Sequence, residues 1–160
     1  WSAGCSIGAE PYTVALLLRE LDPYGRHDIL GTDIDRAALE RAQRGDGYTA
    51  LEVRSLTPER LARFFVQTGS TYAVRPELRE LVRFEQHDLL SDPMERNFDL
   101  ILCRNVVIYF TEEAKGDLYR RFHDALRPGG VLFVGGTEVI YHAREIGFES
   151  GPPSFYRRVA

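Results

Sequence analysis

The sequence is poor in sulfur-containing residues and lacks a long hydrophobic run. Among its 160 residues are two cysteines and one methionine. Cys5 and Cys103 show neither a CxxC pair nor a Cys/His spacing, which excludes a disulfide-stapled mini-protein and a zinc motif. His27, His123 and His142 have no acids or cysteines at ligand spacing, so we expect no metal site. No apolar stretch approaches the roughly 18 residues of a membrane-spanning helix, so we expect no membrane insertion.

The charge balance excludes another class of partner. The chain has 20 Lys and Arg against 24 Asp and Glu, a formal net charge of −4 and a pI near 5.6. A protein that binds nucleic acid phosphates is normally basic, so we expect no nucleic acid partner. With 44% hydrophobic residues, the 160-residue chain can bury a core of its own. We therefore expect one domain, a monomer in a reducing compartment such as the cytoplasm.

Helical and strand patterns alternate along the chain. Apolar residues recur at helical spacing over 10–21 and 112–126, a shorter helix is expected over 37–44, and short apolar strands are expected over 27–32, 82–86, 98–103 and 131–135. Strands alternating with helices predict an α/β fold, with a mostly parallel sheet covered by helices on both faces. Arg127 to Gly130 is expected to form a turn. Residues 139–148 and 154–159 are expected to close the fold as an antiparallel hairpin.

One segment interrupts this alternation. Residues 48–81 contain a helical stretch over 58–65 and a β-rich run over 71–74, and the usual connections of such a fold are much shorter. We expect a small inserted subdomain here.

The first loop has the composition of a ligand-binding turn. Gly4 and Gly8 frame Cys5, Ser6 and Ile7 just before the first expected helix. Glycines let the backbone approach a ligand closely, and free N–H groups at a helix start suit a polar or anionic group. The spacing is neither GxGxxG nor that of a P-loop, and such turns also occur without a ligand.

Acidic residues follow two of the expected strands. Asp33 comes directly after the strand over 27–32, where a carboxylate can accept hydrogen bonds from both ribose hydroxyls of an adenosine, and this is the interpretation we favour over helix capping. For Asp35 we favour capping of the next helix. Asp88 follows the strand over 82–86, and it either accepts from an adenine amino group or caps the following turn.

Four motifs then occur in a fixed order. They are Ser2-Ala3-Gly4-Cys5-Ser6-Ile7-Gly8-Ala9-Glu10-Pro11-Tyr12, Thr32-Asp33-Ile34-Asp35, Cys103-Arg104-Asn105-Val106-Val107-Ile108-Tyr109-Phe110 and Leu126-Arg127-Pro128-Gly129-Gly130. Together they resemble the SAGCSxGxEPY, TDID, CRNVxIYF and LxPGG motifs of the CheR family, the chemotaxis receptor methyltransferases. That family uses S-adenosylmethionine to methylate glutamate side chains.

The resemblance implies a fold, a cofactor and a set of site residues. The fold is a Rossmann-like class I methyltransferase domain over 1–160, with the insertion as the family's small β subdomain. Cofactor contacts are implied at Gly4, Glu10, Asp33, Asp88, Arg104 and Asn105, and Arg104 and Tyr109 are implied near the transferred methyl group. The alternative without a functional role for that pair is a surface arginine and a buried tyrosine. The implied partner is a chemoreceptor or another signalling protein with a methylatable glutamate.

One feature limits that implication. Members of the family carry an N-terminal helical domain before the first motif, and no such domain lies in these 160 residues. Because Met94 is the one methionine and the chain opens inside a motif, we expect a piece of a longer protein.

Two other functions remain open: a class I methyltransferase acting on a small molecule, because this scaffold serves many substrates, and a signalling module that binds the cofactor without transferring methyl groups.

Overall fold

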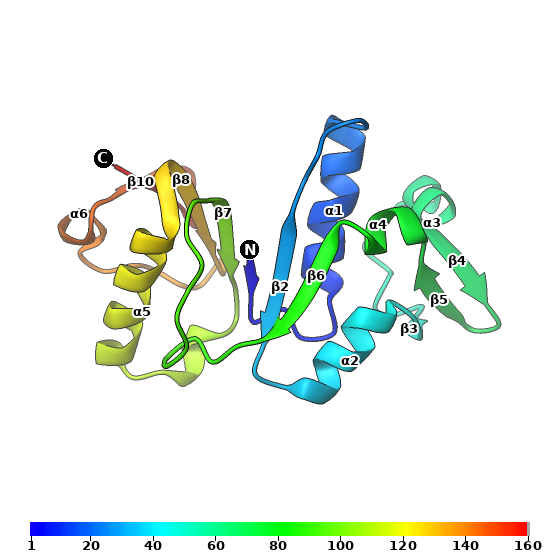
Figure 1. The fold of residues 1–160 in the computed structure, drawn as a ribbon, viewed down its shortest axis with the longest axis horizontal. Helices are drawn as coiled ribbons and strands as arrows, with labels where there is room; N and C mark the ends of the chain where they lie inside the picture. The colour runs from blue at the N-terminus through cyan, green and yellow to red at the C-terminus, as the bar shows by residue number, and fades with distance from the viewer. Residues whose placement is uncertain (160) are drawn as a thin grey trace. The chain divides into compact units, whose positions relative to one another are not determined.

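The computed structural model describes residues 1–159 and divides into two compact units. The first unit comprises Trp1–Gly4 together with the chain from His87 onward, and the second unit is Cys5–Gln86. Figure 1 shows the elements of each unit. The assignment of residues 1–160 to one domain stays a prediction.

The second unit is built on two parallel strands. Strand β2 (Ile29–Asp33) pairs in parallel with β6 (Val82–Gln86) along its whole length. Helices α1 (Ala9–Leu21) and α2 (Arg36–Arg44) both pack against these strands. The Asp35 side chain accepts hydrogen bonds from the first backbone N–H groups of α2, so its predicted role as a helix cap is confirmed.

The insertion forms a small antiparallel sheet inside the second unit. Its strands β3 (Tyr48–Thr49), β4 (Phe65–Thr68) and β5 (Thr71–Val74) lie in the order β3-β5-β4. Two short helices, α3 (Pro58–Phe64) and α4 (Pro76–Arg79), flank the pair β4 and β5 in the sequence. Arg60 on α3 contacts Glu20 on α1 at 2.7 Å. All three strands lie within residues 48–81, and the assignment of that range to an inserted subdomain stays a prediction.

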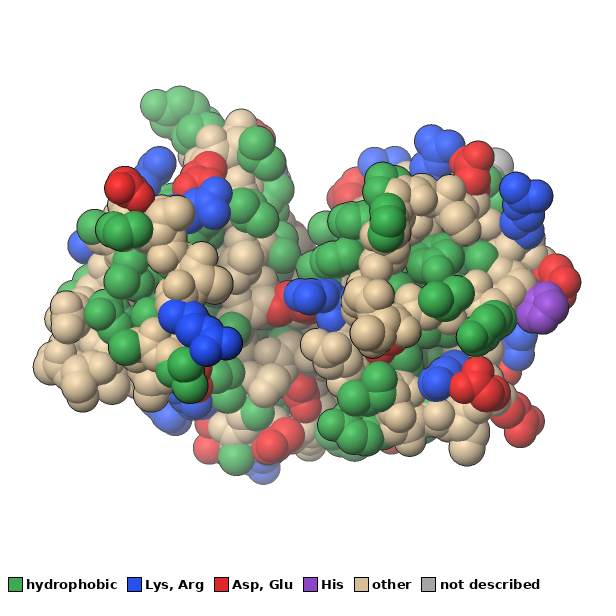
Figure 2. All heavy atoms as spheres, turned by 180° about the vertical axis from the view of Figure 1, so that it is seen from behind, with side chains coloured by type: hydrophobic (Ala, Val, Ile, Leu, Met, Phe, Trp, Pro, Cys, Tyr) green, Lys and Arg blue, Asp and Glu red, His purple; other side chains and the backbone are tan. Residues whose placement is uncertain are grey.

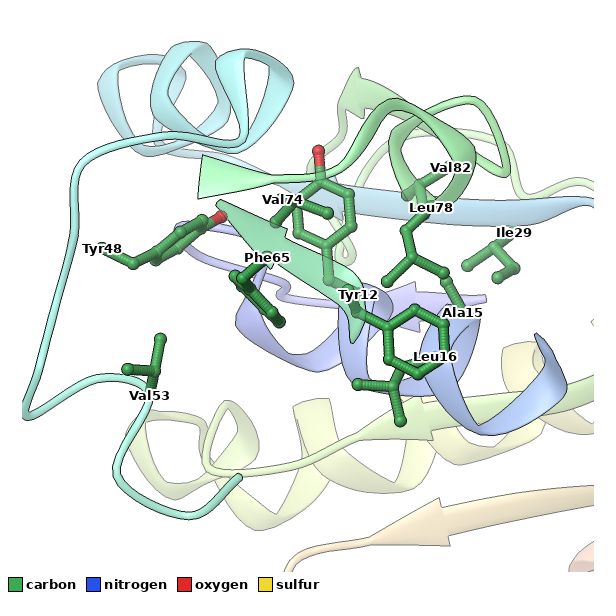
Figure 3. Packing of buried hydrophobic residues seen from close by; sticks show 11 residues of the cluster. Tyr12, Ala15, Leu16, Ile29, Tyr48, Val53, Phe65, Val74, Leu78 and Val82 are labelled. Carbon is green, nitrogen blue, oxygen red and sulfur yellow. The ribbon is translucent and has the colours of Figure 1, made fainter. Parts of the chain in front are cut away.

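One hydrophobic cluster joins the insertion to the parallel strands. Figure 3 shows side chains of α1, the insertion and β6 packed against one another, with Leu16 and Leu78 among them. Leu16 is 1% exposed and Leu78 is 0% exposed. The insertion therefore shares the core of the second unit and is not an independent appendage.

The first unit carries a mixed sheet in the order β1-β7-β8-β10-β9. Strand β7 (Phe98–Cys103) pairs in parallel with β1 (Ser2–Ala3) on one side and with β8 (Leu126–Val134) on the other. Strands β9 (Phe148–Ser150) and β10 (Phe155–Arg158) close the sheet with antiparallel pairs. Helix α5 (Glu112–Ala125) packs along β8 (Figure 1), and the 3-10 helix η1 (Val107–Tyr109) lies between β7 and α5 in the sequence.

The predicted turn at Arg127 to Gly130 is instead part of a strand. Strand β8 begins at Leu126, which pairs with Phe98, and the next pair along the ladder joins Leu100 to Val131. The residues between Leu126 and Val131 therefore bulge out of the ladder rather than reversing the chain.

The predicted strand over 139–148 is also wrong in most of its length. Residues 143–146 form the short helix α6 (Ala143–Ile146), and only the end of the segment belongs to β9. His142 and Gly147, on either side of α6, both have left-handed backbone conformations that a strand cannot continue through. The Ile140 N–H donates to the Tyr156 hydroxyl at 3.1 Å and not to a neighbouring strand.

The face of the molecule shown in Figure 2 is of mixed charge. Figure 2 shows basic and acidic side chains interspersed on the face that it displays, rather than gathered by sign. Within residues 1–159, no helix has both the length and the apolar character needed to cross a bilayer.

Helix α1 offers a matched test of the core of the second unit. We expect Leu16→Ala to lower the free energy of unfolding by roughly 3 kcal/mol, because it opens a cavity in the cluster of Figure 3. Leu21 is 82% exposed on the same helix, so Leu21→Ala should change it by less than about 0.5 kcal/mol. Urea unfolding curves of both variants measure the difference. Equal effects would contradict this packing.

Candidate functional site

The first loop is fastened to the end of β2 by a backbone-to-carboxylate hydrogen bond. The Ser6 N–H donates to Asp33 Oδ2 at 2.7 Å, and the Cys5 N–H donates to the Thr32 carbonyl at 2.8 Å. Asp33 Oδ1 accepts from the Asp35 N–H at 2.9 Å. A carboxylate oxygen has two lone pairs, so each oxygen of Asp33 can accept one further hydrogen bond. The half-buried Asp33 is therefore fixed in place and can still accept hydrogen bonds from a ligand.

The carboxylates of Asp33 and Glu10 affect the Cys5 thiol of the same loop. Burial, together with the smaller effects of the nearby Asp33 and Glu10 charges, raises the pKa of the Cys5 thiol to about 12. Glu10 lies in the first turn of α1 and is half-buried. Cys5 is consequently a neutral core thiol, and the structure brings Glu10 and Asp33 together beside it.

Gly4 lies against the segment that follows β7. Its φ of +81° falls in the left-handed region, and a Cβ atom at this position would lie 2.3 Å from Val106 Cγ2. Only glycine combines that backbone angle with such a close approach. The structure therefore places Gly4 against the segment of Arg104 and Asn105 inside the first unit.

Polar residues follow directly after the buried end of β7. Cys103 is fully buried, while Arg104 and Asn105 are exposed. The Arg104 guanidinium carbon lies 5.3 Å from the centre of the Phe133 ring, a cation–π distance. Asn105 has a left-handed backbone with φ of 59°, which turns the chain into η1.

Tyr109 ends η1 and is 81% exposed, so the alternative of a buried tyrosine at this position is wrong. Its phenol is free of the core and can contact a bound molecule. Arg104, Asn105 and Tyr109 all lie outside the core, and their contacts with the cofactor and the methyl group stay predictions.

Asp88 has a structural role in the turn that it begins. Its Oδ1 accepts from the Leu90 N–H at 2.9 Å and its Oδ2 accepts from the Ser91 hydroxyl at 3.0 Å. These hydrogen bonds, first that from Leu90, lower the pKa of Asp88. The turn-capping alternative is thus confirmed, and a contact with an adenine amino group stays a prediction.

Gly135 and Glu138 were missed by the sequence reasoning. The Gly135 N–H donates to Glu138 Oε2, and a Cβ atom on Gly135 would lie 3.4 Å from Asn105 Oδ1. This turn therefore packs beside Asn105 at the end of β8. A sequence signal existed for Gly135 alone, because Gly135 and Gly136 follow an apolar strand as Gly4 follows β1. Among residues 1–159 no group of three or more possible metal ligands occurs.

Comparison with known proteins gives a consistent set of relatives. The family described as "CheR methyltransferase, SAM binding domain" matches residues 1–152. A chemotaxis protein methyltransferase of Listeria innocua is 44% identical over 98% of this chain and 59% of its own length. One from Escherichia coli is 39% identical over 89% of this chain and 52% of its own length. The chain thus spans between half and three fifths of these two relatives.

A solved structure shares the fold. The TehB-like SAM-dependent methyltransferase of Corynebacterium glutamicum aligns over 98% of this chain and 75% of its own chain, with a TM-score of 0.55 at 20% identity. The predicted class I methyltransferase fold is therefore confirmed, with its parallel strands and its antiparallel C-terminal pair.

The contact between Gly4 and Val106 can be tested against a second glycine. Gly47 also has a left-handed backbone, with φ of +71°, but a Cβ atom there would have no neighbour within 4 Å. We expect Gly47→Ala to lower the free energy of unfolding by about 1 kcal/mol, from backbone strain alone. Gly4→Ala should lower it by about 2 to 4 kcal/mol, because Val106 must also move. Thermal and urea unfolding compare them, and an equal loss would refute the close approach.

Proposed function

The chain belongs to the family of CheR methyltransferase SAM-binding domains, and from that premise we propose that it transfers a methyl group from S-adenosylmethionine to glutamate carboxylates of a chemoreceptor or a related signalling protein. The chain spans about three fifths of its Listeria relative, so activity, substrate and partner all belong to this proposal. We include in it a cytoplasmic location, in keeping with two cysteines that form no disulfide.

The observation that carries the cofactor part is the fixed carboxylate of Asp33. The Ser6 N–H holds it at 2.7 Å at the carboxyl end of β2, and ligands lie at the carboxyl ends of the strands in open α/β sheets. Each oxygen retains a lone pair, and a neutral ribose diol offers two O–H donors to match. We propose that Asp33 holds the ribose and that Gly4, Glu10, Asp88, Arg104 and Asn105 complete the contacts with the cofactor.

The chemistry needs alignment more than acid–base catalysis. When bound, S-adenosylmethionine supplies an activated methyl group on a sulfonium. A glutamate side chain has a pKa near 4.3 and is already an ionised nucleophile at pH 7, so no general base is required. Holding two reactants in line can supply roughly 7 to 11 kcal/mol of barrier reduction.

We assign that alignment to Arg104 and Tyr109. Both follow the apolar strand β7 and are exposed, so their side chains can contact an incoming carboxylate. The Arg104 guanidinium over the Phe133 ring has a preferred orientation before substrate arrives. An arginine that orients the carboxylate, rather than one that stabilises its ground state most strongly, favours the rate of transfer.

Calorimetric titration with S-adenosylhomocysteine tests the role of Asp33. We expect Asp33→Ala to weaken binding by at least about 30-fold, because two hydrogen bonds to a charged acceptor are lost. Asp46 is an exposed acid of the same unit that contacts Arg44, and Asp46→Ala should bind as the parent does. Binding by Asp33→Ala as tight as that of the parent would contradict a role of the Asp33 carboxylate in the proposed site.

Methyl transfer to a chemoreceptor fragment tests Arg104 and Tyr109. We expect Arg104→Ala and Tyr109→Phe each to lower kcat/KM on the order of tenfold to a hundredfold through misalignment. Tyr24→Phe is the control, since Tyr24 is 97% exposed in the other unit. Wild-type kcat/KM in both variants would end the assignment.

The same assays separate the other two functions. A chain that binds S-adenosylhomocysteine but methylates neither receptor fragments nor small carboxylic acids would be a cofactor-binding module. Transfer to small acids alone would make it a small-molecule methyltransferase.

A further inference from the structure

The first unit contains a pocket of about 660 Å³ that the proposed reaction does not use. It lies among η1, α5 and the chain from Thr137 to Ile146. Its walls include Val107, Ile108, Tyr119, Val139 and Tyr141. Of these, Ile108 is 54% exposed, Val139 58% and Tyr141 72%. Apolar side chains gathered in the open around a pocket are typical of a binding surface.

The cations that line this pocket are already neutralised. Lys115 contacts Glu112 at 2.7 Å, and Arg120 contacts Asp117 at 2.5 Å. An anionic ligand would have to compete with these carboxylates for either side chain. The charges of the pocket therefore do not favour an anion.

Glu138 lines the same pocket and is only partly satisfied. It is 8% exposed, and its Oε2 accepts from the Gly135 N–H. Its other oxygen, Oε1, is buried and has no hydrogen-bond partner anywhere in residues 1–159. A buried carboxylate oxygen without a donor is unfavourable, and such groups nearly always have a partner.

A purely structural role explains half of this arrangement. The contact between Oε2 and Gly135 closes the turn after β8, as a neutral glutamine could also do. It does not explain a second buried oxygen with no donor beside a pocket with apolar walls. A cationic N–H group on an aliphatic stem would match both the unpaired oxygen and the apolar walls. Such stems pack on apolar and aromatic side chains while the head pairs with a carboxylate.

We propose that this pocket binds a lysine or arginine side chain of a partner protein, whose cationic head donates to Glu138 Oε1. The stem lies against Tyr119 and Tyr141, and the exposed Ile108 and Val139 contact the neighbouring residues of the partner. The partner is a protein segment rather than a small amine, because a small amine would leave these apolar side chains uncovered. This binding requires no cofactor and is independent of methyl transfer.

Nuclear magnetic resonance titration of the chain with single-residue probes tests the proposal. The probes are the Nα-acetyl amides of lysine and arginine, and their neutral counterparts are those of norleucine and citrulline. We expect the cationic probes to shift the amide resonances of Gly135, Thr137 and Glu138 in a saturable way, with dissociation constants on the order of 1 to 10 mM. The neutral probes should bind at least about tenfold more weakly, because they cannot form a charge-assisted hydrogen bond. A response to lysine alone or arginine alone would identify the head group.

Two variants assign the effect to Glu138. Glu138→Gln should weaken binding of the cationic probes about tenfold, since the negative charge is lost while an acceptor for Gly135 remains. Glu145, whose side chain is 77% exposed, lines the same pocket and pairs with His142. Glu145→Gln should bind the probes within about twofold of the parent, because exposed charges contribute little.

Three results would overturn the proposal. They are equal shifts by charged and neutral probes, unchanged binding by a folded Glu138→Gln variant, and no saturable shift by either cationic probe. If Glu138→Gln does not fold, the comparison of charged and neutral probes on the unchanged chain decides the question.

Discussion

The hydrogen bond from the Ser6 N–H to the Asp33 carboxylate is the contact on which the proposed cofactor site depends. It ties the first loop to the end of β2 at 2.7 Å, and Asp35 fixes the other oxygen of the same carboxylate. Asp35 also caps α2, so the strand, the loop and the helix meet at one acidic pair. An acceptor fixed in this way loses little conformational freedom when a ligand binds, which favours affinity.

The first unit repeats this principle with glycine and close packing. Gly4 allows Val106 to approach, and Gly135 allows the Glu138 carboxylate to approach. Close packing at these two glycines therefore supports the backbone beside the exposed polar residues after β7, although those residues lie in a loop and a short 3-10 helix. A transfer reaction that needs alignment more than proton transfer is well served by side chains supported in this way.

The sequence predicted the elements well where periodicity and capping agree. It predicted β6, β7 and the cap at Asp35, and Arg104, Asn105 and Tyr109 do lie outside the core. Prediction from the sequence failed where tertiary contacts determine the local structure. The residues between Leu126 and Val131 read as a turn but bulge from a strand because Phe98 pairs with Leu126, and residues 139–148 read as a strand although His142 and Gly147 are left-handed. Glu138 was missed because its burial follows from a contact three residues away rather than from any motif.

The most direct test of the central claim is a crystal structure of the chain with S-adenosylhomocysteine. The account predicts both ribose hydroxyls within hydrogen-bond distance, about 2.6 to 3.2 Å, of the Asp33 carboxylate, with the Ser6 hydrogen bond retained. A bound nucleoside whose ribose lies elsewhere, with Asp33 contacting only Ser6 and Asp35, would contradict it.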